Sequence, residues 1–243
     1  MRARRLARRR LGFDNPGLAP QGPQRIVDSA EYDNLAALER DHWYYAGKRR
    51  LVRAWIERLR PPSAHDVLLD CGAGTGLFAA EMERCCRVLV LDDHEESLRM
   101  LRARFPAGQV LVPVGGSVPL PDRSLDYLTA LDVLEHIPDD AAAVRGFARL
   151  LRPGGLMVCS TLNRNPKSFL MAIIGAEWVM RWLPKGTHDW SKFITPDELY
   201  DLIRRAGLDP VDRKGMIFNP VSWSWSLSDR DLSVNYVTAS IRR

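Results

Sequence analysis

Apolar and polar positions alternate regularly along the middle of this chain. Short apolar runs, which are typical of buried strands, lie at residues 67–70, 88–91, 110–114, 125–131 and 156–161. The segments between them, at residues 77–85, 95–104 and about 139–151, have apolar residues at helical spacing. Such an alternation of strands and helices predicts a mostly parallel sheet with helices on both faces.

The flanking segments extend this pattern. Residues 29–60 have a helical spacing that ends at two consecutive prolines. Thr195 and Glu198 have the spacing of a capping box, which predicts a helix to about residue 206. Two closing strands are predicted at about 208–218 and 233–242. The predicted fold is therefore α/β and Rossmann-like, with a seven-stranded sheet in one domain over residues 25–243.

The positive charge of the chain is concentrated at its start. Residues 1–10 contain six arginines and no acid, and without them the net charge of +5 becomes −1. A basic folded surface of the kind that binds nucleic acid is not indicated, and we expect no nucleic-acid partner. Residues 1–24 are predicted to be a basic flexible tail and linker. The tail is compatible with a solvated arm, an arm attracted to anionic lipid or, less well, a transit peptide.

The cysteines do not indicate a metal or disulfide framework. None of the four is placed in a C-x-x-C motif, and the adjacent pair is poorly suited to a mutual disulfide. Reduced thiols of a cytoplasmic type are expected at Cys71, Cys85, Cys86 and Cys159.

A glycine-rich turn after the first predicted strand is the main chemical signal. Asp70 precedes Gly72, Ala73, Gly74 and Gly76, which form a G-x-G-x-G turn ahead of a helix. Such a turn lets the backbone approach a ligand closely. A dinucleotide site has G-x-G-x-x-G spacing and holds pyrophosphate, which a carboxylate at Asp70 would repel. An acid here suits a ligand with an ammonium group, such as the amino-acid end of S-adenosylmethionine.

A second acidic position supports the same ligand. The second predicted strand ends in Asp92 and Asp93, and Asp92 follows Asp70 by 22 residues. This is the position of an acid that grips ribose hydroxyls in nucleotide-binding α/β folds. The alternative is a purely structural glycine turn with two surface acids. A nicotinamide oxidoreductase is a weaker alternative because of the glycine spacing.

These residues resemble the class I S-adenosylmethionine-dependent methyltransferases over about residues 66–160. The resemblance includes residues 131–137 after the fourth strand and 151–155 before the fifth. It implies S-adenosylmethionine as the cofactor, with Leu131 and Asp132 also at its site. Many members have an acid after the third strand for the adenine amino group. Here Gly116 and Ser117 occupy that stretch, so main chain, the Ser117 hydroxyl or packing would hold the adenine.

The segment after the fifth strand is similar to one branch of that family. Residues 160–178, 183–189 and 192–194, with 218–220 and 234–236, closely resemble UbiG-type ubiquinone-biosynthesis O-methyltransferases. The resemblance implies methylation of a catechol or phenol hydroxyl on a polyprenylated quinone precursor, a hydrophobic acceptor. It also implies a cytoplasmic location peripheral to the inner membrane.

An insertion at residues 163–190 is expected to touch a membrane or the substrate. Leu170, Ile174, Trp178 and Trp182 fall four apart on one predicted helical face, with cationic residues at its edges. The run is too short and too charged to span a bilayer, which needs about 20 apolar residues. Contact with an anionic membrane is therefore expected, and a core or dimer-interface helix is the alternative.

The N-terminal part departs from this branch. Residues 30–53 look more like generic class I enzymes that modify sugars, lipids or natural products, which leaves another small-molecule acceptor as an alternative. Only Arg50 with Leu51 matches the UbiG-type pattern. By that match Arg50 is a candidate for the methionine carboxylate, which fits a guanidinium fork. A catalytically inactive binding protein on the same fold is a third hypothesis, disfavoured by the intact glycine turn.

Candidate catalytic groups follow the fourth strand, where open α/β sheets place their ligand crevice. Methyl transfer to oxygen requires an aligned hydroxyl and removal of its proton. Glu135 and His136 are candidate catalytic residues, and His188 after the insertion could reach the acceptor. Alternatively, Asp132, Glu135 and His136 hold a divalent ion that acidifies a catechol. Glu135 and His136 could also only brace the loop.

Overall fold

The computed structural model describes residues 43–170, 190–219 and 221–243. The predicted tail and linker, the first part of the helix predicted at 29–60, His188 and most of the insertion lie outside the described residues. The bounds of the described elements are α2 (Trp43–Leu59), β1 (Val67–Cys71), α3 (Leu77–Met82), β2 (Arg87–Leu91), α4 (Glu95–Arg104), η1 (Ala107–Gln109), β3 (Val110–Leu111), β4 (Leu125–Leu131), η2 (Leu134–His136), α5 (Asp140–Leu150), β5 (Leu151–Leu162), α6 (Pro166–Ser168), η4 (Trp190–Lys192), α7 (Pro196–Arg205), β6 (Leu208–Asn219), β7 (Ser224–Ser228) and β8 (Asn235–Arg242).

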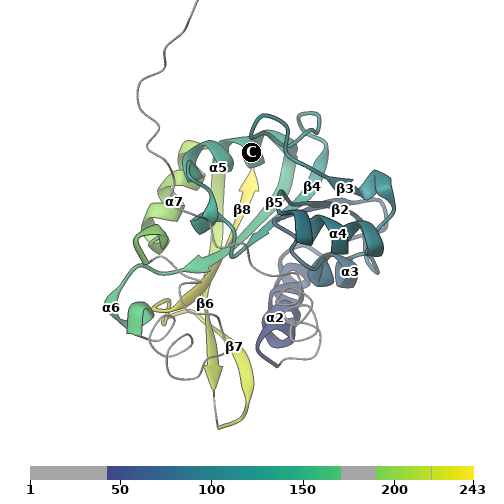
Figure 1. Ribbon diagram of the computed structural model, residues 1–243. Helices are drawn as coiled ribbons and strands as arrows, with labels where there is room; N and C mark the ends of the chain where they lie inside the picture. The colour runs from purple at the N-terminus through teal and green to yellow at the C-terminus, as the bar shows by residue number, and fades with distance from the viewer. Residues whose placement is uncertain (1–42, 171–189, 220) are drawn as a thin grey trace, which may run out of the picture.

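One sheet runs through the molecule in the order β3-β2-β1-β4-β5-β8-β6-β7 (Figure 1). The first five strands in this order, β3, β2, β1, β4 and β5, are parallel to one another. Strand β8 is antiparallel to both β5 and β6. The predicted Rossmann-like α/β class is confirmed. The predicted number of seven strands is wrong, because β7 adds an eighth. Its Ser-Trp-Ser-Leu-Ser sequence pairs only with β6, and its serines kept it from standing out as an apolar run.

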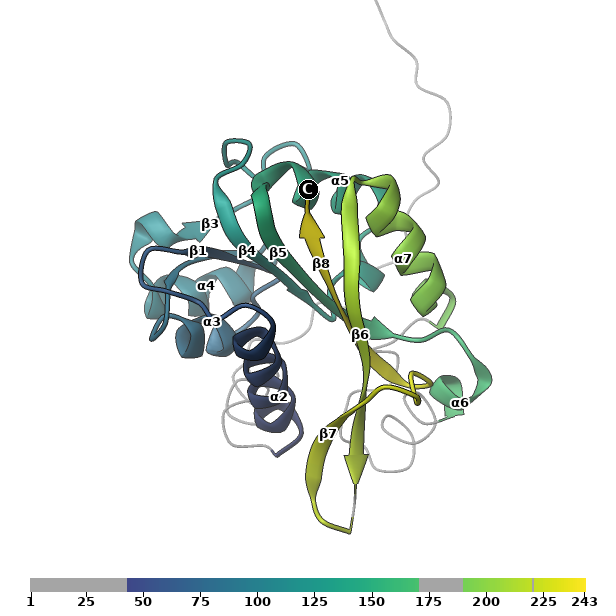
Figure 2. The same cartoon turned by 180° about the vertical axis from the view of Figure 1, so that it is seen from behind.

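Helices cover both faces of this sheet (Figures 1 and 2). Alternate strand residues point to opposite faces because side chains of a strand have a period of two. On β1, Leu69 packs with residues of α5 and α7, whereas Leu68 packs with residues of α2, α3 and α4. The predicted capping box is also present: Thr195 and Glu198 each accept a backbone N–H from the other and so begin α7.

All four cysteines are free thiols, as predicted. Burial raises the pKa of the Cys71, Cys86 and Cys159 thiols. A protonated, buried thiol is a poor nucleophile, so these three cysteines act as small apolar side chains. Among the described residues, no helix is long and apolar enough to cross a membrane.

A buried acid ties the amino-terminal edge of the sheet together. The side chain of Asp126 on β4 is 1% exposed and forms ion pairs with Arg60 and Arg152. It also accepts a hydrogen bond from the backbone N–H of Val67 at 2.8 Å. Arg60, which follows α2, lies over the ring of Tyr127 at 4.5 Å. The end of α2, the start of β1 and β5 are thereby joined through one carboxylate.

We predict that Asp126→Ala destabilises the fold by about 1–3 kcal/mol, because it removes the buried acceptor of the Val67 N–H and the shared partner of two half-exposed arginines. Urea unfolding should show a lower midpoint. Asp122→Ala is the matched control, since Asp122 pairs with Arg149 at an exposed position and should cost under about 1 kcal/mol. Equal losses in the two variants would contradict this account.

Candidate active site

The glycine-rich turn joins β1 to α3 at the carboxyl edge of the sheet, and its backbone donors are occupied. The N–H groups of Gly72 and Ala73 both donate to the Leu91 carbonyl, at 2.8 and 3.1 Å. Gly74 donates to a carboxylate oxygen of Asp92 at 2.9 Å, and Gly76 donates to the Ala73 carbonyl. A phosphate site needs such donors to be available. Their use within the protein argues against a dinucleotide and favours a ligand bound through cationic and hydroxyl groups.

The three glycines of the turn have different roles. All three have positive φ, at 64°, 54° and 74° for Gly72, Gly74 and Gly76. A Cβ on Gly72 would lie 2.5 Å from a methyl of Val133, so this glycine allows the loop after β4 to approach the turn. A Cβ on Gly76 would meet Leu101 and Phe105, so Gly76 packs against α4 and the residue after it, and its contact with the cofactor stays a prediction.

Open space lies over the middle glycine, which supports a ligand position there. A Cβ on Gly74 would meet nothing within 4 Å. The hydroxyl of Thr75, next in the chain, is buried and has no hydrogen-bond partner among the described residues. A turn with unfilled space and an unsatisfied hydroxyl fits a polar ligand such as S-adenosylmethionine.

The predicted acids surround this turn at different depths. Asp70 is buried and accepts a hydrogen bond from the Thr129 hydroxyl at 2.7 Å, so its charge lies behind the turn. Burial raises the pKa of Asp92, although N–H groups of His94 and Gly74 donate to its carboxylate and oppose that shift. Asp93 is exposed. Asp92 is thus the acid that both shapes the turn and retains acceptor capacity for a ribose.

The segment predicted to hold adenine is an exposed tight turn. Val114 and Ser117 exchange two backbone hydrogen bonds, at 2.8 and 3.0 Å. Gly115 and Gly116 between them have φ of 57° and 75°, as a two-residue hairpin turn requires. The backbone N–H of Ser117 is therefore already used, whereas its carbonyl accepts one hydrogen bond and keeps a second lone pair. An adenine contact from Ser117 is left to its carbonyl oxygen, its side chain or packing.

Asp132, directly after Leu131 at the end of β4, is held in an unusual conformation. Its φ is 55°, a region that aspartate tolerates better than most residues. The Ser160 hydroxyl donates to Oδ1 of Asp132 at 2.9 Å, and the backbone N–H of Asp132 donates to the Ser160 carbonyl. On its other side, Lys48 Nζ lies 2.5 Å from Oδ2 of Asp132. The Asp132 carboxylate is thus fixed between β5 and α2.

Glu135 is a buried carboxyl one turn further on. The Thr161 hydroxyl donates to Oε2 of Glu135 at 2.8 Å, whereas Oε1 is buried without a hydrogen-bond partner among the described residues. Burial and the nearby charge of Asp132 raise the pKa of Glu135 to about 7. A carboxyl with this pKa and an unsatisfied oxygen suits proton transfer near neutral pH.

His136 lines a pocket with a volume of about 550 Å³. The pocket is formed by the loop after β4 together with residues of η4 and α7, and Glu135 also lines it. His136 is exposed, and its backbone N–H donates to the Val133 carbonyl. The structure therefore brings two of the three predicted catalytic residues to one pocket. His188 lies outside the described residues.

The predicted metal ligands do not assemble. Within the described ranges, no group of three or more His, Cys, Asp and Glu side chains is placed so that it could hold a metal ion. The Asp132 carboxylate is paired with Lys48 and Ser160, and Glu135 is bonded to Thr161. Asp132, Glu135 and His136 therefore do not form the ion site that their spacing suggested.

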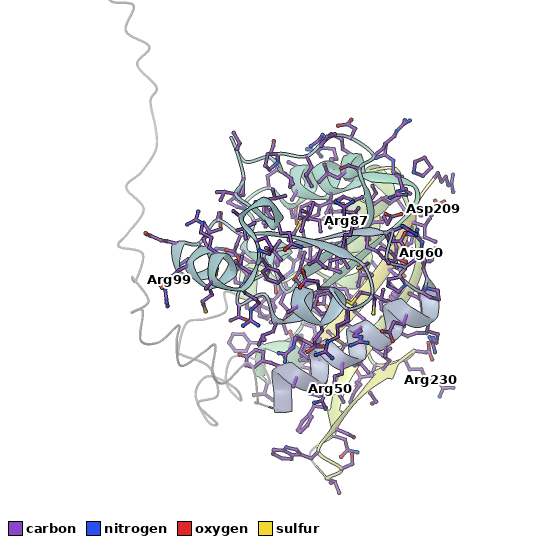
Figure 3. The ribbon with its side chains drawn as sticks, turned by 90° about the vertical axis from the view of Figure 1, so that its right-hand side faces the viewer. Arg50, Arg60, Arg87, Arg99, Asp209 and Arg230 are labelled. Carbon is purple, nitrogen blue, oxygen red and sulfur yellow. The ribbon has the colours of Figure 1, made fainter. Side chains whose placement is uncertain are left out.

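Lys48 is a further residue of the site that was not predicted from the sequence. Its side chain is 12% exposed and reaches Asp132 across 84 residues of chain, while Arg49 pairs with Glu81 of α3 at 3.1 Å. Arg50, the predicted ligand of the methionine carboxylate, is exposed on α2 (Figure 3). No hydrogen bond or ion pair links the Arg50 side chain to another described residue. The helical phase of α2 decides which cation faces the site, and no sequence motif signals it.

Known proteins that are similar in sequence to this chain are methyltransferases. A family model described as a methyltransferase domain matches residues 43–213. A ubiquinone biosynthesis O-methyltransferase of Cereibacter sphaeroides is 57% identical over 188 residues, covering 72% of this chain and 73% of the relative. One from Roseobacter denitrificans is 43% identical and covers 91% of this chain and 99% of the relative.

Solved structures share the fold at lower sequence identity. A possible histamine N-methyltransferase of Thermotoga maritima has a TM-score of 0.64 with 19% identity, and covers 88% of this chain and 96% of that one. An S-adenosylmethionine-dependent methyltransferase of Mesorhizobium loti has a TM-score of 0.56 with 17% identity, and covers 78% and 96%. These likenesses support the architecture.

We predict that Gly72→Ala abolishes binding of S-adenosylmethionine in calorimetry. The new Cβ would clash with Val133, and alanine is strained at this φ by roughly 1–2 kcal/mol. Gly108→Ala is the control, because a Cβ there meets nothing within 4 Å. Combining Gly72→Ala with Val133→Ala should restore part of the affinity. Unchanged affinity in Gly72→Ala would show that the turn and the loop after β4 need not approach so closely.

Proposed function

The chain belongs to the ubiquinone-biosynthesis O-methyltransferase family, and we propose that it methylates a phenolic hydroxyl of a polyprenylated quinone precursor with Glu135 as the proton acceptor. S-adenosylmethionine-dependent O-methylation in ubiquinone biosynthesis follows from the relatives, two of which cover 90% or more of the chain, and from the methyltransferase family model. The observation that carries the role of Glu135 is its buried, half-satisfied carboxyl at the sheet edge. Membership of this family argues against the two alternatives, an unrelated acceptor and a catalytically inactive binding protein.

The residues at the glycine turn would hold the methyl donor. When bound, S-adenosylmethionine supplies a methyl group on a sulfonium, which is a good leaving group. The negative charges of Asp70 and Asp92 favour a cationic ligand at this turn, and Asp92 has acceptor capacity for ribose hydroxyls. The close contact between Gly72 and Val133 places the donor turn beside the loop that carries Asp132 and Glu135.

The loop after β4 would handle the acceptor. Methyl transfer forms an oxygen–carbon bond at the acceptor, whose hydroxyl must lose its proton. The unpartnered Oε1 of Glu135 accepts that proton while the Thr161 hydroxyl holds Oε2. The Lys48–Asp132 pair keeps the loop in position from the other side. The pocket beside His136 offers room for the aromatic ring of an acceptor.

A hydrophobic, prenylated acceptor implies that methyl transfer takes place at a membrane surface. We infer a protein peripheral to the cytoplasmic side of an inner membrane, with the basic tail and the insertion as contacts to anionic lipid. The lack of a basic excess outside the tail supports the expectation that nucleic acid is not a partner. No described helix could cross the bilayer, which fits a peripheral arrangement.

The acceptor class is tested directly by methyl transfer. The purified protein is incubated with labelled S-adenosylmethionine and a short-chain prenylated catechol, with and without EDTA. Transfer to the catechol oxygen is expected in both conditions, because the described acids do not form an ion site. Loss of transfer with EDTA would show that an ion takes part. Donor binding without transfer to any prenylated phenol would overturn the acceptor class.

The pH dependence tests Glu135. Only the carboxylate form accepts a proton, so kcat/KM should rise with pH through a pKa near 7 and level off above it. Glu135→Gln should lower kcat by about 100-fold or more, with donor affinity unchanged. Glu83→Gln, an exposed surface change, is the control. A Glu135→Gln enzyme with normal turnover would exclude Glu135 as the base.

The Lys48→Met variant tests the same pH dependence of kcat/KM in a second way. The positive charge of Lys48 lowers the pKa of Glu135, so its removal should move the rise in kcat/KM to higher pH. Lys48→Arg keeps the charge and should leave the rise near its original position. A profile unchanged in Lys48→Met would show that the Lys48–Asp132 pair does not influence the base.

A further inference from the structure

The strand pair β6 and β7 contains a long uncharged stretch. Between Lys214 and Asp229 no residue is charged, although 27% of the whole chain is. The stretch carries large apolar side chains at Ile217, Phe218, Val221, Trp223, Trp225 and Leu227. Exposed strands at the edge of a sheet usually carry charge, which prevents aggregation. The absence of charge here indicates a surface selected for an apolar environment.

This strand pair projects beyond the carboxyl edge of the sheet. The last residue of β5, Leu162, is level with Asn235 of β8, which is level with Met216 of β6. Residues 217–219 continue past this edge and pair only with β7. Three further residues extend the strand by roughly 10 Å. Figures 1 and 2 show the hairpin as the part that reaches furthest from the sheet at this end. We call residues 217–219 and 221–226 the hairpin tip.

Large apolar side chains are exposed on the hairpin tip. Val221 is 93% exposed and Trp223 is 55% exposed. The ring of Phe218 packs edge-on against Trp223 at 5.3 Å and lies 5.6 Å from Trp225, so the aromatic residues support one another. Tryptophan is enriched at the boundary between hydrocarbon and water because its ring is amphipathic. This composition fits the interfacial region of a bilayer.

Several polar groups of the hairpin tip are satisfied within it. The Asn219 side-chain oxygen accepts from the N–H groups of Val221 and Ser222, at 2.8 and 3.2 Å. The hydroxyls of Ser222 and Ser224 bond to each other at 2.8 Å. Burying a polar group is costly unless it is hydrogen-bonded. These internal bonds reduce the cost of moving the tip out of water.

A second apolar group lies at the same end of the molecule, near α6 (Figures 1 and 2). Phe169 and Trp190 pack edge-on at 6.2 Å, and both are partly exposed, as is Leu170. The exposed Lys192 follows Trp190 by two residues in the chain. Apolar side chains next to a lysine match an interface with acidic or zwitterionic lipid headgroups. The two groups flank the edge that carries the active site.

We propose that the hairpin tip inserts into the lipid bilayer and turns the carboxyl edge of the sheet toward the membrane. The inference rests on the proposed prenylated acceptor, whose tail is held in lipid while its ring must reach the pocket. A Cβ on Gly47 of α2 would lie 2.2 Å from Trp225, so the hairpin packs closely on the helix that carries Lys48. Insertion of the tip therefore places the Lys48–Asp132 pair close to the lipid surface.

Vesicle binding of the full chain tests the proposal. Because the tip is uncharged, its contribution should persist at high salt and on neutral phosphatidylcholine, unlike that of a basic tail. Val221→Asp and Trp223→Ser should each lower partitioning into these vesicles by about tenfold or more. Val211→Asp is the matched control: Val211 is an exposed valine of the same strand, two residues after Asp209, which lies at the opposite end of β6 (Figure 3).

Depth in the bilayer gives a second measurement. A fluorophore attached at Val221→Cys should be quenched by brominated lipids, whereas one at Val211→Cys should not. The labelled wild-type chain supplies the background from its native cysteines. Quenching at both positions, or at neither, would overturn the proposal.

Activity assays separate this proposal from the proposed function. Val221→Asp should keep its affinity for S-adenosylmethionine and its turnover of a water-soluble catechol, and lose turnover only of a long-chain acceptor in vesicles. Loss of turnover with the soluble catechol would make the tip part of the acceptor site and overturn membrane insertion. If the wild type bound anionic vesicles and high salt abolished that binding, the basic tail would be the membrane contact. This result would also overturn insertion of the hairpin tip. If Val221→Asp changed the oligomeric state measured by sedimentation, the hairpin tip would be a contact with a second copy of the chain, and membrane insertion would be overturned.

Discussion

The pairing of β1 with β4 is the constraint on which the site depends. These strands are distant in sequence, yet Asp70 lies opposite Thr129 and accepts its hydroxyl hydrogen at 2.7 Å. The pairing brings the glycine turn after β1 next to the loop after β4. Gly72 and Val133 then approach so closely that no side chain fits at the glycine. The glycine turn and the loop after β4 are thus built as one unit at the point where the strand order reverses.

Buried carboxylates are stabilised differently at the two edges of the sheet. At the amino-terminal edge, Asp126 is surrounded by two arginines and a backbone donor, so its charge is neutralised. At the carboxyl edge, Glu135 has one hydroxyl donor and an acidic neighbour in Asp132, so its charged form is disfavoured. The first arrangement serves stability, and the second leaves a proton affinity suited to catalysis.

The carboxyl edge also organises the surface around the site. Because all parallel strands end there, the glycine turn, the acceptor loop and the extended β6 share one direction. The antiparallel β8 lies between β5 and β6, so β6 runs parallel to β5 and extends past the same edge of the sheet. The contact of Gly47 with Trp225 holds α2 against β7. The glycine turn, the loop after β4, α2 and β7 are therefore joined by one continuous set of contacts.

Local sequence determined much of this protein. The apolar periods predicted most strands and helices, and the glycine turn with Asp70 and Asp92 predicted the cofactor, because these features depend on neighbouring residues. Only tertiary structure decided the rest. The amide donors of the turn are used internally, Gly76 packs on Leu101 of α4 and on Phe105, and the expected ion ligands are separated by their own partners. Lys48 rather than Arg50 meets Asp132 because that choice depends on how α2 rotates against a loop 84 residues away, which no local pattern records.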